Sequence, residues 1–404
     1  MIQTMDPEGR REKILVSACM IVRDEERFLG KCLTSLRDLV DEVVIGDTGS
    51  TDKSPEIARD HGASVFDIPW KDNFAVARNA VIDRARGQWI LTIDADERLR
   101  SFSKKEFFSA LHDTSKWAFY SMLRHKKDWT PYWVLRLFRN DRRIRYRGTI
   151  HENIREGLER VLFLERGEVG YLDMVLDHFG YEGDQAQKYR RNFPLILQEL
   201  RVNPENTNNI RHLGLIYYKL GQAPLAEAKW QRAIRIIANK ETLEPVDSVA
   251  FSYLIESLQN RGKPVRRFLD EALKLFAKNP QLCCLNAREL MVEGRFGQAV
   301  LYLKRLLRWG ECGDYDRSIP HYTRIFDAYP NAYLAICLLM LGRVEESKLC
   351  RDAALNHDPS NPKIQSILKP FIDLYPKAGR LGAIIPRLNR DTHGRRVKIA
   401  DIEE

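Results

Sequence analysis

The chain has 404 residues, enough for two or three domains, and its 44% hydrophobic and 30% charged residues are typical of a soluble globular protein. Its apolar runs fall short of the roughly 20 residues that span a bilayer, so we expect no transmembrane segment. Seven cysteines without a C-x-x-C pair disfavour a disulfide framework or zinc site and predict a cytoplasmic protein. The net charge of +9 favours anionic ligands, but no nucleic-acid-binding module accompanies it, so we expect no nucleic-acid partner.

Strands and helices alternate through the N-terminal half, after a polar start at 1–13 that is predicted to be disordered. Apolar runs predict strands at 14–22, 42–46, 63–66 and 89–93, with helices between them. This alternation predicts a Rossmann-like α/β domain with a mostly parallel sheet over residues 14–182. The chain has neither a G-x-G-x-x-G nor a P-loop sequence, which disfavours dinucleotide dehydrogenases and excludes P-loop NTPases.

Acidic residues follow three of these strands. Asp24 and Glu25 follow the first strand, Asp47 follows the second, and Asp94 and Asp96 follow the strand at 89–93. Because the carboxyl ends of parallel strands share one edge of a sheet, where such sheets bind ligands, we expect these carboxylates to lie close together. An isolated Asp-x-Asp is more often a solvated turn, but three acidic strand ends predict a site for Mg²⁺ or Mn²⁺ carrying a phosphate group.

Four segments occur in a fixed order: the strand ending in Arg23-Asp24-Glu25-Glu26, Val44 through Asp52, Phe74 through Asn79, and Gly87 through Glu97. This pattern resembles the family 2 glycosyltransferases, and especially a subgroup in which tetratricopeptide helices follow the nucleotide-sugar domain. The resemblance implies a GT-A fold, a nucleotide-sugar donor and transfer with inversion. Since the Q-x-x-R-W motif and membrane helices of processive polymer synthases are missing, we expect single transfer.

The resemblance also implies roles for individual residues. By position, Asp47 recognises the base, with Arg78 near it, although an ordinary surface arginine is the alternative for Arg78. Asp94 approaches the ribose, and Asp96 ligates the metal that bridges the diphosphate. Glu25 is assigned to the same nucleotide-sugar site. The expected donor is a UDP-sugar, and the expected cofactor is Mn²⁺ or Mg²⁺.

Three features around this site leave alternatives open. Asp24 stands where the family usually has asparagine, and a carboxylate there would alter the ribose or metal contacts. Glu97, next to Asp96, has no assigned role. Six arginines lie within 136–147; a solvated basic face is the default, and neutralisation of the diphosphate is the alternative.

The residues that act on the sugar acceptor are expected to follow predicted strands at 117–123 and 132–138. Inverting transfer needs a base that takes the proton of the attacking acceptor, and Glu152 is the candidate, with His151 as the alternative. His178 is a candidate metal ligand; a phosphate contact and a structural hydrogen bond are the alternatives.

Helical periodicity replaces the strands in the C-terminal half. It predicts an all-α domain at 183–375, followed by a basic tail at 376–404. From Thr207 on, a 34-residue template fits, with small residues such as Gly214 where paired helices approach closely. These tetratricopeptide-like repeats are expected to hold a peptide or another subunit, and the alternatives are a cap on the catalytic domain or a homodimer contact.

The sequence therefore predicts an inverting, metal-dependent glycosyltransferase whose peptide, protein or glycan acceptor is held by the repeats. One alternative is a catalytically inactive repeat scaffold, which the intact Asp47, Arg78, Asp94 and Asp96 set disfavours. The other is a sugar nucleotidyltransferase, which needs a basic, glycine-rich loop after the first strand, whereas the loop here is acidic.

Overall fold

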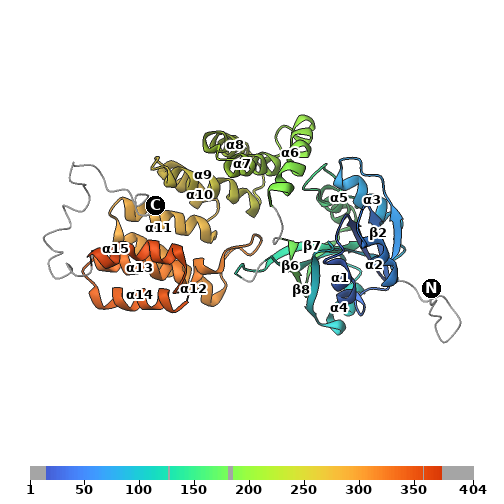
Figure 1. The fold of residues 1–404 in the computed structure, drawn as a ribbon, viewed down its shortest axis with the longest axis horizontal. Helices are drawn as coiled ribbons and strands as arrows, with labels where there is room; N and C mark the ends of the chain where they lie inside the picture. Colours follow the sequence, from blue (N-terminus) through green and yellow to red (C-terminus); the bar gives the residue numbers. More distant parts are fainter. Residues whose placement is uncertain (1–14, 126–127, 181–184, 358, 375–404) are drawn as a thin grey trace. The chain divides into compact units, whose positions relative to one another are not determined.

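The computed structural model describes residues 15–125, 128–180, 185–357 and 359–374 (Figure 1). The chain divides into two compact units, the first up to Asn209 and the second from Ile210 on. The domain boundary predicted at 182/183 precedes helix α6 (Gln185–Val202), which belongs to the first unit. The predicted terminal segments, 1–13 and 376–404, lie outside the described residues.

The first unit is built on one eight-stranded sheet with the order β3-β2-β1-β4-β7-β6-β8-β5. Its strands are β1 (Val16–Val22), β2 (Glu42–Asp47), β3 (Ser64–Asp67), β4 (Trp89–Thr92), β5 (Glu97–Phe102), β6 (Lys116–Arg124), β7 (Tyr132–Arg139) and β8 (Glu168–His178). The pairs among β3, β2, β1 and β4 are parallel, and so is β6 with β8. The pairs β4–β7, β6–β7 and β5–β8 are antiparallel. The predicted α/β domain with a mostly parallel sheet is confirmed.

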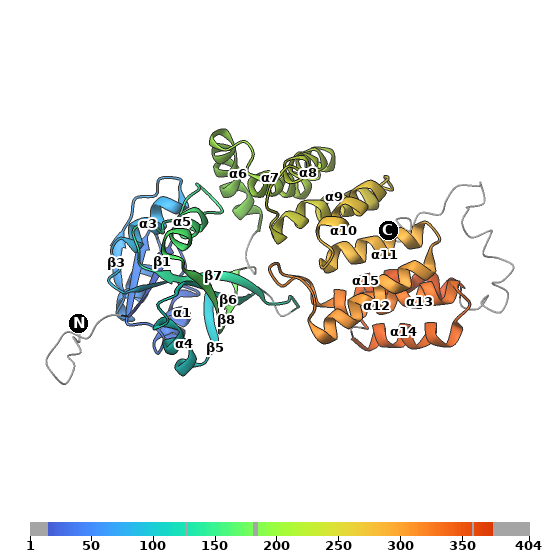
Figure 2. The same ribbon diagram turned by 180° about the vertical axis from the view of Figure 1, so that it is seen from behind.

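Helices cover both faces of this sheet (Figures 1 and 2). Helices α1 (Leu29–Leu36), α2 (Ser54–Asp60) and α4 (Lys104–Leu111) share one core, and α3 (Phe74–Ile82) and α5 (Arg155–Glu165) share the other. In β1, Ala18 and Met20 belong to the first core and Cys19 to the second. Because strand side chains alternate between faces, the continuous apolar run of β1 serves both cores.

The connection between β4 and β5 makes the sheet curl. Only residues 93–96 join the two strands, although these stand four places apart in the sheet order. In a flat sheet that separation is about 19 Å, whereas the five residue steps from Thr92 to Glu97 reach at most about 18 Å. A hydrogen bond from the Glu97 amide to the Asp94 carbonyl shortens the path further. The curl therefore brings the end of β4 and the start of β5 together around Asp94 and Asp96.

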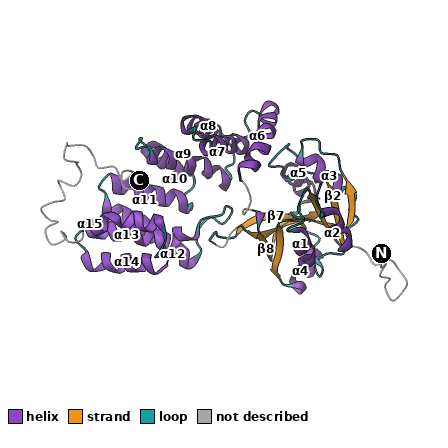
Figure 3. Ribbon diagram, in the orientation of Figure 1, coloured by secondary structure: helices purple, strands orange, loops and turns teal. Residues whose placement is uncertain are grey.

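The described part of the second unit is helical (Figure 3), which confirms the predicted all-α region. Its helices are α7 (Thr207–Lys219), which starts at the end of the first unit, α8 (Ala223–Ile237), α9 (Ser248–Asn260), α10 (Arg266–Leu275), α11 (Pro280–Val292), α12 (Phe296–Cys312), α13 (Ala328–Met340), α14 (Val344–His357) and α15 (Pro362–Leu374). A Cβ at Gly214 would lie 2.4 Å from the Trp230 Nε1 atom, so this glycine lets α7 and α8 approach closely. Over the described ranges, no helix combines the length and apolar character that a membrane crossing requires.

A buried histidine makes the stability of the second unit depend on pH. His321 is 4% exposed, lies beside Tyr315 and Phe326, and is hydrogen-bonded to the carbonyl of Asp316. Burial lowers the pKa of His321 from 6.5 to about 4, against the opposing pull of Asp316. Between these values the unfolded chain binds a proton that the folded chain excludes, so this stabilisation is complete above pH 6.5 and is lost as the pH falls toward 4.

We expect the free energy of unfolding of the second unit to be about 2 kcal/mol lower at pH 5 than at pH 7 through this group. Urea unfolding of the full chain followed by circular dichroism measures it. The His321→Gln variant is the control, since it should lose this part of the pH dependence. The same slope in both proteins would contradict the assignment to His321.

Candidate active site

Carboxylates at the ends of β1 and β2 bind the loop that follows β2. Asp24 Oδ1 accepts hydrogen bonds from the Thr51 amide (2.7 Å) and hydroxyl (3.1 Å). The carboxylate of Asp47 accepts from the amides of Ser50 (3.1 Å) and Gly49 (3.3 Å). These bonds order the loop between β2 and α2 at the carboxyl edge of the parallel strands, which is where the base contact of Asp47 was predicted. That contact stays a prediction.

Asp94 and Asp96 lie in a turn that is fixed from both sides. The Asp94 amide donates to Glu97 Oε2 (3.1 Å), and the Glu97 amide donates to the Asp94 carbonyl (2.9 Å). On the other side, the Phe179 amide donates to the Asp96 carbonyl (2.8 Å), just beyond the end of β8. The β5–β8 register pairs Glu97 with His178, so the end of β8 lies directly beside this turn.

This pairing brings Asp96 and His178 together, with 3.5 Å between His178 Nε2 and Asp96 Oδ2. Burial raises the pKa of Asp96, an effect that His178 opposes. Burial lowers the pKa of His178, which favours the neutral imidazole that binds metals. Gly180 packs against the same carboxylate, since a Cβ there would lie 1.7 Å from Asp96 Oδ2. The two predicted metal ligands are thus neighbours in space.

Glu25 reaches the same place from the end of β1. Its pKa is raised to about 7 by burial and by the nearby charge of Asp96, while Lys188 on α6 lowers it. Strand β1 pairs in parallel with both β2 and β4, so the carboxyl ends of these three strands lie side by side. The three acidic strand ends therefore meet at one edge, as the alternation of strands and helices predicts.

Arg78 links the donor and acceptor residues of the prediction. Its Nη2 atom lies 2.8 Å from Asp94 Oδ1, and its Nε atom lies 2.6 Å from Glu152 Oε1. Burial by itself would raise the pKa of Asp94, but Arg78 and Arg136 hold it well below its usual value. The carboxylate predicted to approach the ribose and the candidate base are therefore held by one guanidinium group.

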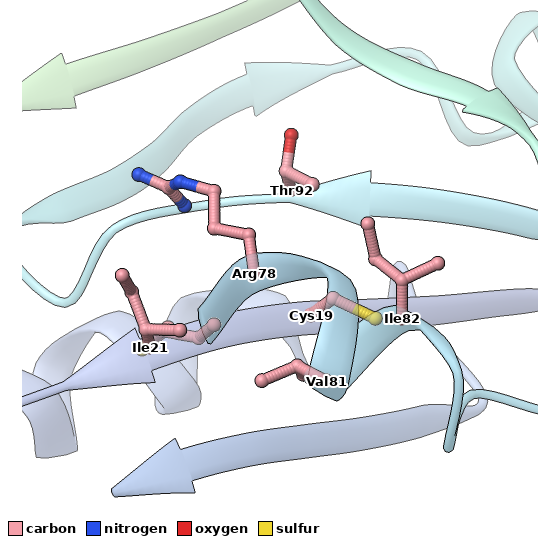
Figure 4. Close-up of a pocket in the computed structure, with 7 residues that line it drawn as sticks. Cys19, Ile21, Arg78, Val81, Ile82 and Thr92 are labelled. Carbon is pink, nitrogen blue, oxygen red and sulfur yellow. The ribbon is translucent and has the colours of Figure 1, made fainter. Parts of the chain in front are cut away.

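Arg78 is not an ordinary surface arginine, because its side chain is only 12% exposed. Figure 4 shows it beside a hollow between α3 and strands β1 and β4. The other residues that line this hollow are Cys19, Met20, Ile21, Val81, Ile82 and Thr92. These residues are mostly apolar and offer the Arg78 guanidinium few hydrogen-bond acceptors. It pairs instead with the carboxylates of Asp94 and Glu152.

A second buried ion pair lies beside the turn that carries Asp94 and Asp96. Glu97 is completely buried and pairs with Arg136 of β7, whose Nη2 atom also lies 3.6 Å from Asp94 Oδ2. Burial raises the pKa of Glu97 to about 7, although Arg136 opposes this. The sequence does not indicate this pair, because Arg136 is one of six arginines in a short stretch.

Other arginines of 136–147 hold the first unit together. Arg139 donates to the Lys116 carbonyl (2.7 Å), and Arg145 pairs with Asp83 (2.9 Å). These contacts join the end of β7 and the following loop to neighbouring elements, so these two side chains are structural.

The loop that carries His151 and Glu152 is held by two helices. The Thr149 amide donates to Glu199 Oε2 of α6 (2.7 Å), and the Thr149 carbonyl accepts from the Phe74 amide at the start of α3 (2.9 Å). Within this loop, Glu152 points to Arg78, and its side chain is 11% exposed. His151 is half-buried and has a positive φ of 56°. The geometry places Glu152 in the Arg78–Asp94 ion-pair network.

Comparisons with known proteins agree with this architecture. Residues 17–180 match the family described as glycosyl transferase family 2. A TPR repeat-containing protein of Synechococcus elongatus is 40% identical over 180 residues, which are 43% of this chain and 44% of that protein. The SPbeta prophage-derived glycosyltransferase SunS of Bacillus subtilis is 27% identical over 212 residues, 47% of this chain and 46% of SunS. The chain thus spans less than half the length of these curated relatives.

Solved structures show weaker similarity. TarS of S. aureus in complex with UDP is 14% identical, with 61% of this chain and 82% of that chain covered and a TM-score of 0.34. Glucosyl-3-phosphoglycerate synthase of Mycobacterium tuberculosis with Mn²⁺ and UDP-glucose is 23% identical over 28% of this chain and 44% of that chain, with a TM-score of 0.24. The sequence matches carry the comparison: residues 17–180 match the family 2 glycosyltransferases, and that family is shown for this segment of the chain.

Proposed function

We propose that the chain transfers a sugar, with inversion, from a nucleoside-diphosphate sugar to an acceptor and that Mn²⁺ or Mg²⁺ is required. The observation that carries the proposal is the contact between Asp96 and His178 beside Asp94, at the carboxyl edge of the sheet in a family 2 domain. The proposed donor is a UDP-sugar, because the Asp47 carboxylate can accept a hydrogen bond from the imide N–H of uracil.

The donor atoms at this edge suit a divalent metal. One carboxylate oxygen of Asp96 and one nitrogen of His178 would hold it. In the described part of the chain, no group of three or more His, Cys, Asp or Glu side chains forms a metal cluster. Such a pair is nevertheless adequate, because Mg²⁺ at phosphate sites is commonly bound by one or two carboxylates, substrate oxygens and water. The metal would neutralise charge on the departing diphosphate.

The acceptor half of the reaction is assigned to Glu152. Arg78 binds its Oε1 atom, and Oε2 would take the proton of the acceptor hydroxyl or thiol. The acceptor atom forms a bond with the anomeric carbon on the face opposite the phosphate, and the bond from that carbon to the phosphate oxygen breaks. The nucleoside diphosphate leaves with the electron pair. Because Arg78 also pairs with Asp94, the carboxylate proposed to contact the ribose of the donor and the proposed base are held close together.

The second unit is proposed to recruit a peptide, protein or glycan acceptor, as helical repeats commonly present an extended binding surface. Homodimer formation through these helices is the alternative role. We place the protein in the cytoplasm, because its seven cysteines are all free, as expected in a reducing compartment.

Nucleoside diphosphate release tests the proposal. The full chain is incubated with Mn²⁺ or Mg²⁺ and a panel of nucleotide sugars with different bases, and slow hydrolysis is followed. We expect one nucleoside diphosphate to be released, and a chelator to stop the release. Release of pyrophosphate would instead indicate a sugar nucleotidyltransferase. Failure to bind any nucleoside diphosphate with Mn²⁺ by calorimetry would indicate an inactive scaffold.

A further inference from the structure

Helix α6 follows the family 2 match at 17–180 but is anchored on the catalytic unit at three points. The Lys188 ammonium donates to the Gly180 carbonyl (2.7 Å), and the Arg191 guanidinium lies 5.4 Å from the centre of the Phe74 ring. Near the other end of the helix, Glu199 accepts the Thr149 amide. The helix therefore has a defined position over the donor edge and the loop that carries the candidate base.

The Lys188 anchor places a positive charge beside the predicted metal ligands. Gly180, whose carbonyl Lys188 binds, packs directly against the Asp96 carboxylate. The charge of Lys188 also acts on Glu25, Asp96 and His178. Lys188 is half-buried, so solvent screens this charge less than it would on an open surface.

The donor edge needs such a cation. Arg78 and Arg136 lie among Asp94, Glu97 and Glu152, so that two positive charges face three negative ones when all are ionised. Asp96 and Glu25 add two further carboxylates to the edge. A divalent metal offsets part of this charge, but a diphosphate brings at least two more negative charges to the same place. Because like charges repel, a further cation beside the metal ligands would favour binding of the diphosphate.

Resting on the proposed function, we infer that Lys188 of α6 binds the diphosphate of the donor directly and holds it as the leaving group. A lysine ammonium suits this task as a mobile point charge with three donors, one of which can keep the Gly180 carbonyl. The catalytic domain is then functionally longer than the segment that matches the family. It includes the first long helix after that segment.

The test is the binding of UDP, UMP and uridine to the full chain with Mn²⁺, measured by calorimetry. If the nucleotide-sugar panel selects another base, the corresponding diphosphate, monophosphate and nucleoside are used. We expect Lys188→Met to weaken UDP binding on the order of 10–100-fold, the effect of one charge-assisted hydrogen bond. Binding of uridine should be unchanged, and Lys188→Arg should restore part of the affinity for UDP.

The matched control is Arg201→Met, which removes one charge from an exposed position about 20 Å further along the same helix. It should leave UDP binding unchanged. Equal UDP affinity in Lys188→Met and the unaltered protein would overturn the inference while the proposed function stands. An equal loss of uridine and UDP binding would also overturn it, because Lys188 would then be structural. If the unaltered protein bound no nucleoside diphosphate, the proposed function itself would fail.

Discussion

Replacement of Arg136 by leucine is expected to destabilise the first unit by about 3–5 kcal/mol, the usual cost of removing one partner from a buried ion pair. Glu97 has no exposed surface, and Arg136 is its ion-pair partner in the structure. Without Arg136, Glu97 must stay charged in an apolar environment or bind a proton, and both are unfavourable. This loss is a large share of the stability of an ordinary domain.

Urea unfolding of the full chain measures this effect. The double variant Arg136→Leu with Glu97→Gln should recover part of the lost stability, because glutamine is neutral and its side-chain oxygen can still accept the Asp94 amide. As a further comparison, Arg142→Leu removes an exposed arginine from the same stretch and should change little. An Arg136→Leu protein as stable as the original would show that the pair contributes nothing.

Replacement of Asp96 by asparagine is expected to reduce metal-dependent release of the nucleoside diphosphate by about 1,000-fold or more, since a metal that stabilises leaving-group charge contributes several kcal/mol. The side chain keeps its size but loses the charge that a hard cation requires. Initial rates with Mn²⁺ and the donor selected by the panel measure the effect. Asp67→Asn is the matched control, because Asp67 is an exposed carboxylate at the end of β3, which stands three places from β4 in the same sheet.

The same assay separates the metal ligand from the base. Glu152→Gln should slow transfer to an acceptor strongly, while binding of the nucleoside diphosphate with Mn²⁺ persists. If Glu152→Gln transferred normally while Asp96→Asn did not, the base would have to be another group, with His151 as the next candidate. Normal activity of Asp96→Asn would remove the metal role from Asp96.

The parallel half of the sheet was predictable because its strands carry strong signals. β1 and β4 are continuous apolar runs, and each ends in carboxylates that mark the functional edge. β5 gave no comparable signal, since Glu97–Phe102 has the sequence ERLRSF, with charged residues on both faces. It is held by its pairing with β8 instead of by its own composition. The contact between Asp96 and His178 depends on that pairing. The sequence could therefore suggest each of them as a metal ligand from its residue type, but it could not predict that they touch.

The sequence also could not predict which residues form long-range ion pairs or which unit helix α6 joins. Arg78 and Arg136 come from different elements, and their partners are set by the curl of the sheet. The helical periodicity after residue 184 predicts α6 well, but periodicity does not show which unit a helix joins. The contacts of Lys188 and Glu199 decide that: Lys188 binds the Gly180 carbonyl, and Glu199 binds the Thr149 amide of a loop 50 residues earlier in the chain.

The packing of Gly180 against Asp96 limits which sequences can keep this active site. Position 180 performs no chemistry, yet any side chain there would occupy the space of the Asp96 carboxylate, and the backbone conformation is not the reason. In a library of all amino acids at this position, glycine alone should support activity. The equivalent library at Gly297 of α12, where a Cβ meets no other atom within 4 Å, should be broadly tolerated. A residue that never touches the substrate would then be as restricted by selection as Asp96, the proposed metal ligand against which it packs.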